Sequence, residues 1–166
     1  CDLSIVDAQI HVTGTKALEV LQVADAYEED NPVDWERAVE LVEEVLGNSD
    51  DLTPRFEARE RSILRRSVQA PQPIETVRVD FDNEVSEVST VIEVAGPDRL
   101  GLLYEVSSTI VAAGLDTQQA RVQTVGGDVV DSFYVQTLDG AKFTDAEAQE
   151  ALRAALLEVL SARDDD

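Results

Sequence analysis

The residues that could carry chemistry meet in one short segment, Asp98-Arg99-Leu100-Gly101, between an apolar strand-like run and a segment with helical periodicity. The first backbone N–H groups of a helix lack intrahelical partners and lie at the positive end of the helix dipole. An anion such as the carboxylate of an amino acid binds well there. Gly101 has no side chain that would keep a ligand from the backbone, and the Asp98 carboxylate suits an ammonium group. The pattern is therefore compatible with an amino-acid site.

A purely structural turn is the alternative, with Asp98 as the helix N-cap and Gly101 as a packing contact. Patterns for catalysis or metal binding do not occur in the sequence. His11 is the only histidine and has no Cys, Asp or Glu at metal-ligand spacing, so we expect it on a sheet surface. The one cysteine, Cys1, cannot form an internal disulfide or a thiolate metal site. We therefore predict a binding module with no catalytic residues, no metal and no cofactor in this chain.

The charge excludes several classes of partner. The 166 residues include 35 acidic and 13 basic side chains, for a formal net charge of -22. Nucleic acids and anionic membranes require clustered Lys and Arg, so we expect neither as a partner. The sequence shows no apolar run of about 18 residues and no export signal, which favours the cytoplasm. The acidity suits a solubilising surface or a salty habitat.

An internal repeat organises the chain. The stretch from Leu3 to Gly14 resembles the stretch from Leu115 to Gly126, an offset of 112 residues (126 − 14). Each copy reads as a strand, a glycine-containing turn and a second strand, and a segment with helical periodicity follows in both. The first of these helices is predicted to begin at Asn31-Pro32 and to end at Gly47.

The second copy has additional elements in front of the repeat. Residues 89–95 read as a strand, and a helix follows with Leu103, Val106 and Ile110 on one face and Gly114 at its end. The last helix is predicted to carry a capping box of Thr144 and Glu147. Its apolar stripe comprises Leu152, Leu156, Val159 and Leu160.

These patterns divide the chain into units. Residues 1–48 are predicted to be the back half of a first unit, 49–73 a linker and 74–83 the closing strand of the first unit. Residues 88–163 form a second unit that lacks a fourth strand, and 164–166 are a tail. An unpaired sheet edge would follow, and the two units, or two chains, would then share edges.

Four stretches resemble the final ACT domain of bacterial PII uridylyltransferases: Thr90-Val-Ile-Glu-Val, Asp98-Arg-Leu-Gly-Leu-Leu-Tyr, Ala120-Arg-Val-Gln-Thr-Val-Gly and Asp131-Ser-Phe-Tyr-Val. The lead-in Phe81-Asp-Asn-Glu-Val-Ser is similar as well. The resemblance extends over 77–160, and more loosely over 3–46. One departure falls in the candidate site, because the family usually has proline where this chain has Leu100.

The resemblance implies an α+β fold of ferredoxin-like ACT domains (βαββαβ), with an antiparallel sheet and helices on one face. It also implies glutamine as a ligand of Asp98, Arg99, Leu100 and Gly101, and PII signalling protein as the partner of a parent nucleotidyltransferase that uses magnesium. ACT units would pair within or between chains. Two alternatives stay open: an ACT regulatory or dimerisation module of another metabolic enzyme or alarmone synthetase, and a ligand-free interaction module.

Overall fold

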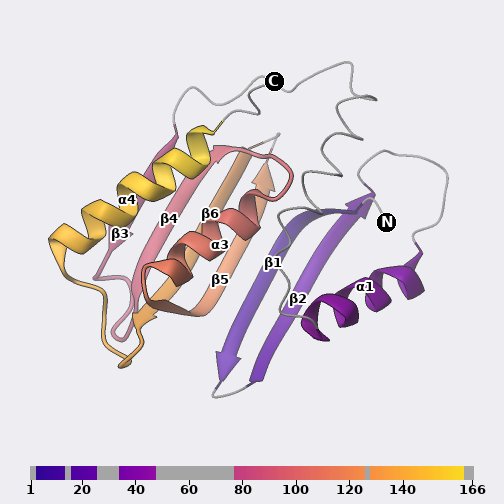
Figure 1. The fold of residues 1–166 in the computed structure, drawn as a ribbon, viewed down its shortest axis with the longest axis horizontal. Coiled ribbons are helices and arrows are strands. Elements are labelled where there is room, and N and C mark those ends of the chain that lie inside the picture. Colours follow the sequence, from indigo (N-terminus) through magenta and orange to yellow (C-terminus); the bar gives the residue numbers. More distant parts are fainter. Residues whose placement is uncertain (1–2, 14–15, 26–33, 48–76, 126–127, 163–166) are drawn as a thin grey trace.

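The computed structural model describes residues 3–13, 16–25, 34–47, 77–125 and 128–162. All of the described strands belong to one antiparallel six-stranded sheet in the order β2-β1-β5-β6-β4-β3, and helices α3 and α4 lie on one face of its β3–β6 part (Figure 1). The predicted α+β class, with helices on one face of an antiparallel sheet, is confirmed. The elements in chain order are β1 (Leu3–Thr13), β2 (Lys16–Asp25), α1 (Trp35–Gly47), β3 (Arg78–Asp82), β4 (Thr90–Pro97), α3 (Leu102–Ala112), β5 (Leu115–Val125), β6 (Asp128–Thr137) and α4 (Ala146–Ser161).

The repeat in the sequence is also a repeat in the structure. Strand β1 begins at Leu3 and β5 begins at Leu115, which is the predicted offset, and β2 and β6 are related in the same way. Strands β1 and β2 form one antiparallel hairpin, and β5 and β6 form the other. The second copy also has the predicted order of strand, helix, strand, strand and helix, in β4, α3, β5, β6 and α4.

Strand β3 differs from the sequence-based assignment. The sequence pattern places residues 74–83 in the first unit, but β3 pairs with β4 of the second unit, from Arg78 opposite Ala95 to Asp82 opposite Val91. The sheet of the second unit therefore has four strands, and its fourth position is filled by chain that precedes β4. The expected absence of a strand after the last helix concerns residues that, beyond Ala162, lie outside the described part of the chain.

The connection between β3 and β4 gives the physical reason. The Asp82 carboxylate accepts hydrogen bonds from the backbone N–H groups of Glu84 (2.6 Å) and Val85 (2.9 Å). The Ser86 hydroxyl accepts from Ser89 N–H at 3.1 Å. A short connection that is held by such hydrogen bonds favours antiparallel pairing of the two strands that it joins.

The two units do share a sheet edge, but a different one from the edge expected. Strand β1 pairs with β5, from Asp7 opposite Gln123 to His11 opposite Gln119. His11 is exposed on the sheet, as predicted. The first unit therefore continues the sheet at the edge opposite β3, and Ile10 packs against the core of the second unit.

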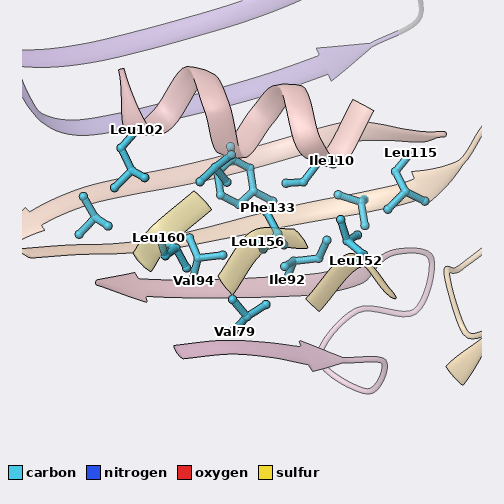
Figure 2. Packing of buried hydrophobic residues seen from close by; sticks show 14 of the residues in the cluster. Val79, Ile92, Val94, Leu102, Ile110, Leu115, Phe133, Leu152, Leu156 and Leu160 are labelled. Atoms are coloured by element: carbon cyan, nitrogen blue, oxygen red, sulfur yellow. The ribbon is translucent and has the colours of Figure 1, made fainter. Parts of the chain in front are cut away.

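The core lies between the β3–β6 sheet and helices α3 and α4 (Figure 2). Phe133 of β6 is 2% exposed, and Ile110 of α3 and Leu156 of α4 are fully buried. Helix α3 places Leu102, Val106 and Ile110 inside, whereas the predicted Leu103 is only partly buried. Because these side chains come from both helices and from the strands, the packing of the second unit fixes the position of the β4–α3 turn.

The helix starts follow local side-chain chemistry. Helix α4 is capped by Asp145, whose carboxylate accepts from Ala148 N–H at 2.8 Å, and not by the predicted Thr144. Helix α1 has Asp34 in this role, with Arg37 N–H donating at 3.0 Å, and it ends at Gly47 as predicted. The predicted start at Asn31-Pro32 lies outside the described residues. None of the described helices is long and apolar enough to cross a membrane.

Candidate functional site

The segment Asp98–Gly101 connects the end of β4 to the start of α3, as the sequence predicted. Gly101 is the N-cap of α3 and has the left-handed backbone angle φ 79°. This angle suits glycine, which has no Cβ to clash with the backbone. The N-cap offers no side-chain hydrogen bond to the helix, so the first turn of α3 presents its N–H groups without a capping side chain. The alternative in which Asp98 is the N-cap is wrong.

Asp98 is joined to the neighbouring strand β5 by a side-chain hydrogen bond. Its Oδ2 accepts a hydrogen bond from the Thr124 hydroxyl of β5 at 3.3 Å. Partial burial raises the pKa of the Asp98 carboxyl, and the like charge of Asp128 acts in the same direction. The turn therefore holds an acidic group with a nearby hydroxyl next to a helix N-terminus that no side chain caps.

Arg99 has a different position from the one expected of a ligand contact. Its guanidinium donates to both carboxylate oxygens of Glu105, at 2.9 and 2.6 Å, and to the Val159 carbonyl oxygen at 3.0 Å. The first bond pair joins the turn to α3, and the third joins it to α4. The guanidinium therefore holds the turn in place, and a ligand at this site would meet the backbone of Arg99.

The other two residues of the turn are accessible. Leu100 is 39% exposed, and Gly101 is partly exposed. Leu102 N–H donates to the Arg99 carbonyl at 3.2 Å, so the turn closes with leucine where the resembled family usually has proline. All four residues predicted from the sequence thus lie at one end of α3.

Asp131 is a residue of this region that the sequence pattern did not single out. It is 1% exposed, and its Oδ1 accepts from Gln123 N–H at 3.1 Å. Burial raises the pKa of the Asp131 carboxyl to about 7, with the Asp98 charge adding to the rise and the Gln123 bond opposing it. A signal for it was present in the sequence, because Asp131 is the one acid among the apolar residues on its face of β6, Val129, Phe133 and Val135.

The first unit reaches the same region of β5. Gln123 pairs with Asp7 of β1, and its Nε2 donates to Asp7 Oδ1 at 3.4 Å. Gln123 is next in sequence to Thr124, which binds Asp98. The candidate site therefore lies close to the seam between the two units. Within the described ranges, no group of three or more His, Cys, Asp or Glu side chains is placed to hold a metal ion.

Substitutions of Gly101 test the turn geometry. We expect Gly101→Val to lower the free energy of unfolding by about 2 kcal/mol, because a β-branched residue is strained at positive φ. Gly101→Asn should have a smaller effect, since asparagine enters this region more readily. Chemical denaturation measures both variants. Equal stability of the valine variant and the unsubstituted protein would contradict the observed backbone.

Comparisons with known proteins give a consistent result. The family model described as the ACR9-like, ACT-like domain matches residues 78–162, which contain the whole turn. A bifunctional uridylyltransferase/uridylyl-removing enzyme from Bradyrhizobium sp. (strain ORS 278) is 35% identical over 165 residues, 97% of this chain and 17% of that enzyme. Proteins of the same description are 39% identical over 166 residues in Gluconobacter oxydans (95% of this chain, 17% of that enzyme) and 48% over 86 residues in Phenylobacterium zucineum (52% and 9%).

The chain thus spans about a sixth of the length of the relatives that it matches along its whole extent, at 17% of each. No solved structure gives a significant match.

Proposed function

Since the chain belongs to the ACT-like domain family, we propose that it is the regulatory, amino-acid-sensing region of a PII-modifying uridylyltransferase. The observation that carries this proposal is the match of almost the whole chain to enzymes described as bifunctional uridylyltransferase/uridylyl-removing enzymes. The part matched is small, which suits a control region and not the whole enzyme. We place the parent enzyme in the cytoplasm, and its catalytic domain, with any magnesium, outside this chain.

The proposed ligand is glutamine, bound at Asp98, Arg99, Leu100 and Gly101. The N–H groups at the start of α3 would receive its α-carboxylate, because no side chain caps them. The Asp98 carboxylate would receive its ammonium group. The net charge of -22 disfavours glutamate, whose second carboxylate meets a field of the same sign. Binding would then shift the parent enzyme between uridylylation of PII and removal of the uridylyl group.

Glutamine should stabilise the protein. At about 100 times the dissociation constant we expect the free energy of unfolding to rise by about 2.7 kcal/mol. For a chain of this size this corresponds to roughly 2–4 °C in Tm per kcal/mol. Thermal unfolding with glutamine, and with glutamate as the matched ligand, measures the effect.

Two acids of the second unit provide the variant and its control. Asp98→Asn removes the proposed ammonium partner and should abolish the shift. Asp80→Asn removes an acid of the edge strand β3, where Asp80 Oδ2 lies 3.0 Å from Arg78 Nε. This variant should retain the thermal shift. The full-length protein is the decisive sample, because the first unit adjoins the site. No shift there, or equal shifts with glutamate and glutamine, would contradict the sensor proposal.

A further inference from the structure

Asp131 and Asp98 approach each other from two elements that the β4–α3 turn brings together. Asp131 comes from β6, where its backbone lies opposite Val94 of β4. Asp98 begins the turn that follows β4. Asp131 Oδ1 accepts from Gln123 N–H at 3.1 Å and Asp98 Oδ2 accepts from the hydroxyl of the next residue, Thr124, at 3.3 Å, so the two carboxylates bind adjacent residues of β5. Two carboxylates in one partly buried place repel each other unless one holds a proton.

The surroundings of Asp131 offer little compensation for a negative charge. Its neighbours along this face of β6, Val129 and Phe133, are buried and apolar, and its carboxylate accepts a hydrogen bond from Gln123 N–H. No salt bridge within the described part of the chain involves Asp131. An ionised carboxylate in such a place is costly, so the proton is retained up to a higher pH than in water.

The basic residues on the adjoining elements do not reverse the upward shift of the Asp131 pKa. Arg99, in the turn, is bound to Glu105 of α3, so these two charges compensate each other. Arg121 of β5 is exposed between buried Ala120 and Val122 and therefore points to the opposite face of the sheet.

The acids nearby add to the repulsion or lie apart from it. The charge of Asp128 on β6 raises the pKa of Asp98, and Asp7 of β1 accepts a hydrogen bond from the Gln123 side chain. The N-terminus of α3 is a positive element that opposes the repulsion, and it follows Asp98 in the turn. The balance of these groups therefore favours a proton on Asp131.

We propose that Asp131 and Asp98 make the β4–α3 turn a pH-sensitive element: the turn stays against β5 and β6 while Asp131 holds a proton, and it is displaced when Asp131 ionises. The hydrogen bond from the Thr124 hydroxyl to Asp98 should break first, because at 3.3 Å it is long and joins the Asp98 side chain directly to β5. The transition falls near neutral pH, where burial places the pKa of Asp131 at about 7. The device acts on the proposed ligand turn, yet it operates without a ligand.

Hydrogen exchange of the turn amides tests the device in the absence of any amino acid. Rates are normalised to those of an unstructured peptide at the same pH. Between pH 6 and pH 8 we expect the protection of the Leu102 amide, which donates to the Arg99 carbonyl, to fall about tenfold, which corresponds to a difference of one pKa unit for Asp131 between the two positions of the turn. Asp131→Asn and Asp98→Asn, which each remove one of the two charges, should show no such decrease. The β3–β4 connection, Asn83–Ser89, is the internal control and should not respond.

A pH-dependent decrease that persists in Asp131→Asn would overturn the proposal. A direct measurement covers the case in which a variant fails to fold. The carboxyl carbon of Asp131 in the unsubstituted protein should titrate near pH 7 by NMR, and titration below pH 5 would overturn the proposal as well. Both pH experiments are done without a ligand. A negative result in them therefore leaves the glutamine proposal intact, and absence of a thermal shift with glutamine leaves the pH proposal intact.

Discussion

We expect Phe133→Ala to lower the free energy of unfolding by about 3–5 kcal/mol, because the substitution removes a ring from the centre of the core. Phe133 is 2% exposed and lies on β6 between the sheet and the two helices (Figure 2). Its neighbours in the core include fully buried Ile92, Ile110 and Leu156, which are held by three different elements. These residues cannot move together into the vacated space without separating strand and helix, so a cavity remains.

Chemical denaturation of Phe133→Ala measures this destabilisation. Leu138→Ala is the matched control, because Leu138 directly follows β6 and is 82% exposed. It should change the free energy of unfolding by no more than about 0.5 kcal/mol. Similar effects of the two substitutions would show that the packing between α3, α4 and the sheet is not as described.

Asp131→Asn should stabilise the protein at neutral pH. In the folded protein burial raises the pKa of Asp131 to about 7 from the ordinary value of 3.8. Between these two values the unfolded chain loses the proton and the folded protein keeps it, so stability falls as pH rises. Above about pH 7 both states are ionised and the decrease is complete. It amounts to about 4 kcal/mol at most, at about 1.36 kcal/mol per pKa unit.

Comparison of Asp131→Asn with the unsubstituted protein isolates the contribution of Asp131 to the pH dependence of stability. The difference in free energy of unfolding, Asp131→Asn minus unsubstituted protein, should increase from about pH 4 to about pH 7 and then level off. Acids that do not interact with Asp131 contribute equally to both proteins; Asp82, for instance, has a pKa lowered by hydrogen bonds from Glu84 and Val85. Denaturation curves at each pH supply the values. A difference that is constant with pH would show that Asp131 titrates normally in the fold.

The sequence by itself determined the local elements and the place of the candidate site. Apolar spacing and glycine positions are local properties, so the repeat, the hairpins and the helices near residues 102–112 and 146–161 were predictable. The turn Asp98–Gly101 was found in the same way, since Gly96-Pro97-Asp98 separates a β-rich run from a helical pattern, although β4 itself continues to Pro97. The sequence did not decide the N-cap of α4, because Thr144 and Asp145 are both residue types that cap helices well. In the structure Asp145 is the N-cap.

Only the tertiary structure decided which strands became neighbours and which side chains became buried. The pairing of β3 with β4 is as compatible with the local pattern as pairing with the first unit, and the fastened Asn83–Ser89 connection settles it. The role of Arg99 depends on Val159, which is far away in the chain. The unusual pKa of Asp131 arises because the tertiary packing buries its carboxyl on β6. Such desolvation is a property of packing, and no local sequence pattern specifies it.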